Sequence, residues 1–303
     1  MKKFAFLGIA VILVVTYALF TFSTDPEIVP QSTETEILPH HIYLPQMPDS
    51  MSFADENVPL DRIDVYESLD REIITNTFWH TNLILILKRS ARYFPVIEPI
   101  LRECGVPDDF KYLCVAESSL VPTAKSPAGA VGLWQILETT GKELGLEIND
   151  EVDERYDIQK STRAACKFLL RAQKTYNWSW TLLAASYNGG QNRVAKNASQ
   201  QQQSNYYDML WGEETGRYVF RILAFKTLMS NPQAYGFMVD ENDYYKPYEC
   251  EEIVVNQGIE DIAQWAIDHG TTYKAVKMLN PWLRKNKLTN ARRKEYTILV
   301  AKF

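Results

Sequence analysis

The sequence predicts a mainly α fold with a small α+β unit at its C-terminal end. Three observations support this prediction. Apolar residues recur at three- and four-residue spacing over most of the stretch from Asp61 to Ser230. Within that stretch we find no convincing alternating run of the kind that indicates a half-buried strand. After Pro232 the pattern changes to a short strand, two helical segments and a second short strand.

Composition limits the classes of protein to which the chain can belong. With 303 residues, of which 46% are hydrophobic, it is long enough for one substantial core and a small second unit. The formal net charge of -6 argues against nucleic acid as a partner, because neutralising phosphates needs an excess of Lys and Arg. From Thr271 to Phe303 there are nine Lys or Arg and one acid, which fits either a solvated surface or contact with an anionic wall or membrane.

The N-terminus carries an export signal. Lys2 and Lys3 precede an apolar run from Phe4 to Phe22 that is long enough to span a bilayer as a helix. We therefore assign residues 1–23 to a signal peptide or membrane anchor, and expect the protein in the periplasm or cell envelope. No clean small-residue cleavage site follows the run, which favours the anchor. Residues 24–60, rich in Pro, Ser and Thr, are expected to be an extended linker.

Residues 61–235 are expected to form a single helical domain. Apolar spacing predicts a first long helix from Asp61 to about Tyr93. Pro95 and Pro99 are expected to divide the chain that follows into separate segments. Further helices are predicted at residues 138–144, 159–175, 180–187 and 214–230, and the Gln-rich residues 200–203 are expected in a loop.

Glu117 is the strongest candidate for a catalytic acid. Pro107, followed by two aspartates, is typical of a helix start and places Glu117 near the C-terminal end of that helix. The residues before it are mostly apolar, so desolvation is expected to raise its pKa and keep it protonated near neutral pH. A protonated carboxyl group can donate a proton to a leaving glycosidic oxygen. The loop from Ser126 to Gly132 is rich in small residues, which permits tight backbone geometry near a ligand.

The cysteines give no indication of a metal site. The chain has four, and they show none of the short paired spacings of zinc ligands. Cys104, Cys114 and Cys166 lie among apolar residues, so they are small core residues or, in an exported protein, include an oxidisable pair. We expect no metal and no cofactor, because the chemistry proposed for Glu117 is proton transfer.

Three motifs occur in order along the chain: Glu117-Ser118, Gly129 to Gln135 (GAVGLWQ) and Ala185 to Gly190 (ASYNGG). Together they resemble the lytic transglycosylase family, which shares the goose-type lysozyme-like (SLT) helical fold. The words DFKYL from Asp109, VDERYD from Val152 and ETGRY from Glu214 are similar to the membrane-bound lytic transglycosylase D branch of that family. The resemblance covers about residues 58 to 303, and it implies a lysozyme-like domain over residues 61–235.

The resemblance also implies a reaction. Peptidoglycan glycan strands would be cut at the β-1,4 bond between N-acetylmuramic acid and N-acetylglucosamine, without water, to give 1,6-anhydromuramic acid ends. Glu117 would protonate the leaving oxygen and then, as a carboxylate, take the proton of the attacking C6 hydroxyl. A glycosidase that uses two carboxylates would need a second acid across the sugar. Four other acids are available and are interpreted as structural or solvated charges: Glu138, Asp153, Glu154 and Asp157.

By the same resemblance, five further residues would bind substrate: Ser118, Gln135, Tyr187, Asn188 and Tyr218. Each has a structural alternative, since Gln135 and Ser118 can stabilise turns, Asn188 can end a helix before two glycines, and both tyrosines can belong to the core. Trp134 stands where many relatives have Met, and it either stacks on a sugar or packs in the core.

Residues 236–303 resemble a LysM-like unit, a module that binds N-acetylglucosamine polymers. The match is weak in detail, so this unit either binds glycan or packs on the main domain as a structural addition. Two alternatives to the transglycosylase remain: a lysozyme-like hydrolase of the same bond, and a non-catalytic peptidoglycan-binding protein. A second carboxylate facing Glu117 would favour the hydrolase. The sequence identifies no protein partner.

Overall fold

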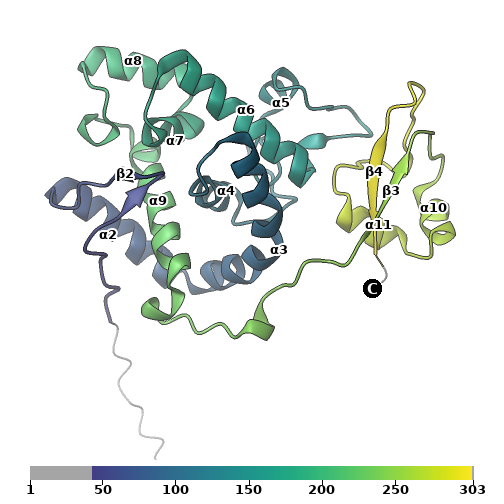
Figure 1. Cartoon of the computed structure of the whole chain (residues 1–303), viewed down its shortest axis with the longest axis horizontal. Coiled ribbons are helices and arrows are strands. Elements are labelled where there is room, and N and C mark those ends of the chain that lie inside the picture. Colours follow the sequence, from purple (N-terminus) through teal and green to yellow (C-terminus); the bar gives the residue numbers. More distant parts are fainter. Residues whose placement is uncertain (1–42, 302–303) are drawn as a thin grey trace, which may run out of the picture. The chain divides into compact units, whose positions relative to one another are not determined.

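The computed structural model describes residues 43–301, and most of this part of the chain is helical, as the sequence predicts (Figure 1). The expected targeting segment, residues 1–23, lies outside the described residues. Between residues 43 and 301, no helix combines the length and the apolar character needed to cross a bilayer.

Two helices stand where the sequence predicts one long helix. α2 (Ile63–Phe78) and α3 (His80–Cys104) are separated at Trp79, whose φ of -86° and ψ of 59° are not helical. α3 then continues through Pro95 and Pro99, so the predicted breaks there are wrong. Both prolines are exposed, and the carbonyl groups that lose an N–H partner lie on the solvent side of the helix, where water can replace it.

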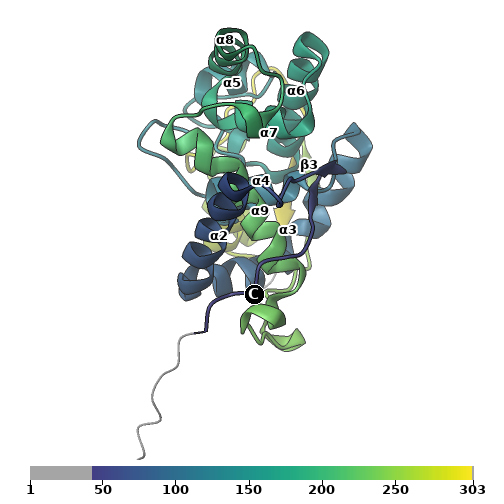
Figure 2. The ribbon, with the colours of Figure 1, turned by 90° about the vertical axis from the view of Figure 1, so that its left-hand side faces the viewer.

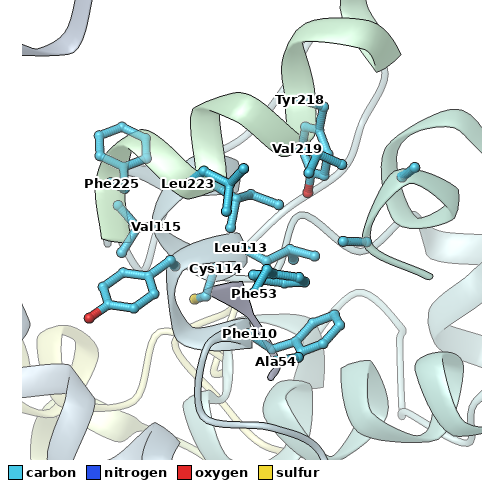
Figure 3. Packing of buried hydrophobic residues seen from close by; sticks show 14 of the residues in the cluster. Phe53, Ala54, Phe110, Leu113, Cys114, Val115, Tyr218, Val219, Leu223 and Phe225 are labelled. Carbon is cyan, nitrogen blue, oxygen red and sulfur yellow. The ribbon is translucent and has the colours of Figure 1, made fainter. Parts of the chain in front are cut away.

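The short helix α4 (Phe110–Ser118) packs against α3 and α9 (Glu213–Ser230). Phe110, Leu113, Cys114 and Val115 are fully buried, and Figure 3 shows them in one cluster with Phe53 and with side chains of α9. The helix ends at Ser119, which adopts a left-handed φ of 50°. Glu117 therefore lies in the last turn of a helix whose position is fixed by the core.

The four helices predicted after α4 lie within two residues of their expected bounds, whereas α8 (Gln191–Gln201) and four 3₁₀ helices within residues 43–301 are additional. The other bounds are α5 (Glu138–Glu143), the 3₁₀ helix η1 (Glu154–Tyr156), α6 (Ile158–Tyr176), α7 (Trp180–Gly189), and the 3₁₀ helices η2 (Tyr206–Asp208), η3 (Pro232–Tyr235) and η4 (Glu241–Asp243). α8 is not predicted, because Val194 is its one fully buried residue and the apolar pattern is correspondingly weak. α8 also includes Gln200 and Gln201, so the expectation of a loop there is wrong for these two residues. Figure 2 shows α6, α7 and α8 gathered at one end of this domain.

The end of the expected linker is folded onto the helical domain. β1 (Ser52–Phe53) and β2 (Glu56–Asn57) pair antiparallel, and the ring of Phe53 packs 5.2 Å from that of Phe110. The carboxylate of Glu56 accepts hydrogen bonds of 2.6 and 2.9 Å from the first two N–H groups of α7. The expectation of an extended tether does not hold here, because Phe53 is buried in the core and Glu56 caps a helix.

The C-terminal elements have the predicted order. β3 (Glu251–Val255) and β4 (Tyr296–Val300) pair antiparallel, and α10 (Ile262–Asp268) and α11 (Tyr273–Leu279) lie between them in the chain. Asp261 and Thr272 cap the two helices by accepting hydrogen bonds from backbone N–H groups of the first turn. An apolar cluster that includes Trp282 and Ile298 forms the core of this unit.

Candidate active site

Glu117 has the environment of a carboxylic acid that is protonated near neutral pH. Its side chain is half-buried at the end of α4. Burial raises its pKa to about 7, and the charge of Glu214 also raises it, while the hydrogen bond from Tyr218 and the charge of Arg221 oppose the rise. Such a group can exchange a proton with a substrate at neutral pH without a metal or a second acid.

Tyr218 on α9 holds the Glu117 carboxyl group. Its hydroxyl donates a hydrogen bond to Oε1 of Glu117, and its ring is almost completely buried. Figure 3 shows Tyr218 on the α9 side of the cluster around α4. Burial and the charge of Glu117 both raise the pKa of Tyr218, so this hydroxyl keeps its proton and acts as a donor.

A buried carboxylate on α2 fixes the helix that carries Tyr218. Glu72 is 1% exposed and accepts a hydrogen bond of 2.7 Å from Arg217, while Arg221 lies 3.9 Å from its second oxygen. Arg221 also pairs with Glu214 at 3.2 Å. Since Arg217 and Arg221 flank Tyr218 along α9, these pairs help to hold the helix in the rotation that points the Tyr218 hydroxyl at Glu117.

Three of the predicted substrate residues line one cavity. Gln135, Tyr187 and Asn188 border a space of about 590 Å³, together with Phe168 and residues at the start of α8. The hydroxyl of Tyr187 donates a hydrogen bond of 2.7 Å to the carbonyl of Trp134. Burial raises the pKa of Tyr187, and the charge of Glu117 raises it further. Glu117 is not among the residues that line the cavity, and Tyr187 is the lining residue on which its charge acts. A space of this size and mixed polarity is typical of a site for a small organic ligand.

Gln135 and Asn188 make structural contacts as well as lining the cavity. The side-chain amide of Gln135 donates to the carbonyls of Gly132 at 2.9 Å and Ala124 at 3.3 Å, which stabilises a left-handed backbone with φ of 47°. Oδ1 of Asn188 accepts a hydrogen bond of 3.1 Å from Thr215. The helix-ending role considered for Asn188 falls instead to Gly190, which follows α7 with φ of 82°. The two proposed roles of Gln135 can thus coexist.

Ser118 and Trp134 lie in the core. Oγ of Ser118 donates to the carbonyl of Cys114 at 3.2 Å within α4, and the residue is buried, which favours the structural interpretation of this serine. Trp134 is fully buried, and its indole N–H donates to Thr162 at 2.8 Å. Of the two alternatives for Trp134, the structure has the core position.

The four other acids weighed as second carboxylates are engaged elsewhere. Asp153 pairs with Arg155, Glu154 with Lys160 and Lys294, Glu138 with Lys142, and Asp157 accepts the N–H of Lys160 at the start of α6. Glu214 is the carboxylate whose charge acts on Glu117, and it is exposed and paired with Arg221. Within residues 43–301 there is no group of three His, Cys, Asp or Glu side chains that could hold a metal ion, and the four cysteines are free thiols.

Two known families match parts of this chain. The family described as "Transglycosylase SLT domain" matches residues 96–210, which include Glu117 and the residues that line the cavity. Residues 96–210 belong to the SLT transglycosylase domain family. The family described as "Soluble lytic transglycosylase C-terminal LysM-like domain" matches residues 251–302. The SLT match ends before α9, so Tyr218 lies beyond it.

Individual relatives match parts of the chain. Membrane-bound lytic murein transglycosylase D of Escherichia coli (strain K12) is 31% identical over 159 residues, which are 51% of this chain and 35% of the relative. Peptidoglycan transglycosylase gp16 of Escherichia phage T7 is 35% identical over 79 residues, 26% of this chain and 6% of its own. The X-ray structure of lytic transglycosylase Slt from Pseudomonas aeruginosa is similar with a TM-score of 0.39 and 18% identity, over 51% of this chain and 26% of that one. The match therefore spans about a third of the Escherichia coli relative.

Sequence reasoning missed three residues that act on the SLT site. Arg221 and Glu214 change the pKa of Glu117, and Arg155 donates hydrogen bonds to the carbonyls of Gly129 and Ile136, on either side of Gln135 in sequence. Arg221 follows Tyr218 by one helical turn, so the predicted helix α9 already implies that both side chains lie on the same face. Arg155 and Glu214 lie in the words VDERYD and ETGRY, but those words alone give no role to either side chain.

Tyr218→Phe is expected to lower kcat/KM for cleavage by about 10- to 100-fold, because a hydrogen bond to a charged group contributes about 1.5–3 kcal/mol. Without the hydroxyl the pKa of Glu117 rises further, so the alkaline limb of the pH–rate curve should move to higher pH. The measurement is kcat/KM between pH 5 and 9, with Tyr112→Phe, on the buried face of α4, as the control. A Tyr218→Phe curve identical to that of the wild type would contradict the assigned hydrogen bond.

Proposed function

We propose that the chain is a peptidoglycan lytic transglycosylase in which Glu117 acts as general acid and then as general base. The observation that carries this proposal is the half-buried Glu117, whose pKa burial raises to about 7 and whose carboxyl group accepts a hydrogen bond from Tyr218. A cavity lined by Gln135, Tyr187 and Asn188 lies in the same domain. A pKa near the working pH lets one group give and later accept a proton. The match to the SLT transglycosylase domain family supports the substrate class.

The proposed reaction needs one carboxyl group. Glu117 gives its proton to the glycosidic oxygen as the bond to C1 of N-acetylmuramic acid breaks. The C6 hydroxyl oxygen of the same sugar then bonds to C1, and its proton passes to the Glu117 carboxylate. The proton lost in the first step is regained in the second, and no water is consumed. The Tyr218 hydrogen bond stabilises the carboxylate between the two steps.

The cavity is proposed to hold the sugars, with Gln135, Tyr187 and Asn188 as contacts. Its lining also includes Arg171, Arg193 and Glu143, so cations outnumber acids there. Guanidinium groups bind carboxylates well, which suits a substrate that carries peptide carboxylates. Ser118 is proposed to support the end of α4, and any contact between it and sugar stays a prediction.

Residues 1–23 are proposed to export the chain and to hold it at a membrane, so that the enzyme works in the periplasm or cell envelope. The apolar run from Phe4 to Phe22 supports this, as does the description of the Escherichia coli relative as membrane-bound. Domain limits of 61–235 and 236–303 are likewise proposals, as is glycan binding by the second of these units.

Product analysis tests the activity. The purified full chain is incubated with isolated peptidoglycan, and the released fragments are weighed by mass spectrometry. We expect fragments that end in 1,6-anhydromuramic acid. Fragments heavier by one water would instead make the enzyme a lysozyme-like hydrolase, and no release by folded protein would favour a binding protein.

The hydrolase remains the second candidate because of one carboxylate. Glu214 raises the pKa of Glu117 through its charge and is exposed to solvent. A hydrolase would need such a group to position a water molecule across the sugar. If Glu214 has that role, Glu214→Gln should abolish hydrolysis, whereas a transglycosylase should keep most of its rate. The product assay with this variant distinguishes the two.

A further inference from the structure

The C-terminal unit is bonded to the segment that follows α5 in the SLT domain. Residues 151–153 lie along this unit like an added strand. Three backbone contacts hold them: the antiparallel bridge between Val152 and Leu283, the Asp153 N–H to the Trp282 carbonyl at 2.9 Å, and the Arg284 N–H to the Glu151 carbonyl at 2.7 Å. The Glu151 carboxylate adds a hydrogen bond of 2.6 Å from the N–H of Thr289.

Three residues of the SLT domain belong to the apolar core of the C-terminal unit. They are Val131, Val152 and Tyr156, which are 2%, 1% and 7% exposed. Val131 lies within the loop of small residues that leads to Gln135. One continuous buried cluster therefore includes the C-terminal core and a residue of the substrate-binding loop, and opening either part would expose apolar surface to water.

Asp153 and Arg155 connect this interface to two points of residues 126–136, which form the 126–136 loop. The Asp153 carboxylate accepts hydrogen bonds of 2.9 and 2.7 Å from the Arg155 guanidinium, and both side chains are at least nine-tenths buried. The remaining nitrogen of Arg155 donates to the carbonyls of Gly129 at 3.3 Å and Ile136 at 3.2 Å. Because a guanidinium group is planar and rigid, it fixes the distance between the carbonyls to which it donates.

The backbone of Arg155 also contacts the loop directly, at Gly132. A Cβ atom placed on Gly132 would lie 2.2 Å from the carbonyl oxygen of Arg155, so the two backbones are in direct contact. The Gln135 side chain donates to the Gly132 carbonyl within the same loop. The contacts thus connect Trp282 through Asp153 and Arg155 to Gln135, which lines the cavity.

We propose that the C-terminal unit holds the 126–136 loop in its substrate-binding shape, with Asp153 and Arg155 as the positioning residues between them. The inference rests on the proposed function in so far as Gln135 binds the glycan. It gives the C-terminal unit a role in the SLT site whether or not that unit also binds glycan itself.

Arg155→Lys tests the connection in the full chain. Lysine keeps the positive charge beside Asp153 but cannot hold the carboxylate and both carbonyls together. We expect amide hydrogens of residues 126–136 to exchange about tenfold faster and KM for soluble peptidoglycan strands to rise about tenfold, with kcat within about twofold, because substrate must first select the ordered loop. Simple loss of folded protein would lower the apparent kcat and leave KM unchanged. Arg163→Lys is the matched control, since it makes the same change at an ion pair with Glu103 on another face of the domain.

A second pair of variants tests whether the core of the C-terminal unit affects the 126–136 loop. Leu283→Ala removes a buried side chain beside Val152, and Ile262→Ala removes one at the start of α10 in the same core. Leu283→Ala should speed exchange in the 126–136 loop, and Ile262→Ala should do so less. The proposal would be overturned if the amide hydrogens of residues 126–136 exchanged in both Arg155→Lys and Leu283→Ala at the wild-type rate. Hydrogen exchange decides this even if the wild type cleaves nothing, so failure of the proposed activity is recognised separately.

Discussion

Glu117→Gln is expected to slow cleavage of the glycan at pH 7 by about 10²- to 10⁴-fold, the range for loss of a general acid or base. Glutamine has nearly the same shape as glutamic acid, so the cavity and the contact with Tyr218 can persist. Its amide cannot release a proton to the leaving oxygen, and it cannot accept one from the C6 hydroxyl. The loss should therefore appear in kcat, with little change in KM.

The same substitution is expected to stabilise the protein above pH 7. Burial raises the pKa of Glu117 from 4.5 to about 7 in the folded state. Between these pH values the folded chain keeps a proton that the unfolded chain has released, so the free energy of unfolding falls as pH rises. A shift of this size corresponds to at most about 3 kcal/mol, and partial exposure of the side chain makes about 1–2 kcal/mol the expected gain.

Both effects are measured on one preparation. Initial rates of fragment release give kcat and KM, and thermal unfolding at pH 5 and pH 8 gives the stability difference between variant and wild type. That difference should grow from pH 5 to pH 8. Glu138→Gln, which alters an exposed ion pair with Lys142, is the control for both measurements. A fully active Glu117→Gln enzyme would refute the assigned role, and a pH-independent stability difference would refute the raised pKa.

The helices could be predicted where one apolar face repeats without interruption. α6 and α9 begin and end within one residue of their expected bounds, because the apolar periodicity is continuous over both helices. α3 could not be predicted, since whether a proline ends a helix depends on which side faces solvent. The β1–β2 hairpin escaped prediction for a related reason: the burial of Phe53 depends on a site formed by α4, which is distant in sequence.

The candidate site divides in the same way. Gln135, Tyr187 and Asn188 lie in ordered local motifs and line one cavity, whereas Glu117 lies outside that lining. The pKa of Glu117 depends on Tyr218, Arg221 and Glu214 of α9, which are distant from it in sequence, so no local pattern indicates their effect. The dependence of the loop on the C-terminal unit was equally hidden, because a buried valine such as Val131 gives no sign of which core it enters.

Gly132→Ala is expected to destabilise the protein by about 3 kcal/mol or more, among the larger effects of a single methyl group. The added Cβ would lie 2.2 Å from the carbonyl oxygen of Arg155, a backbone atom that cannot turn aside. In addition Gly132 has a φ of 79°, a backbone angle that residues other than glycine rarely adopt. Relief of the clash requires the loop to move away from Arg155, and that movement should also weaken substrate binding through Gln135.

Gly129→Ala separates the two causes. Gly129 has a similar φ of 83°, but a Cβ there would meet nothing within 4 Å. Strain alone should then cost about 1 kcal/mol, so the difference between the variants measures the contact with Arg155. Urea unfolding of both variants gives this difference. If the two variants were destabilised equally, the loop could move away from Arg155 at no cost. Glycine would then be needed at position 132 because of its left-handed backbone, and the contact with Arg155 would add nothing.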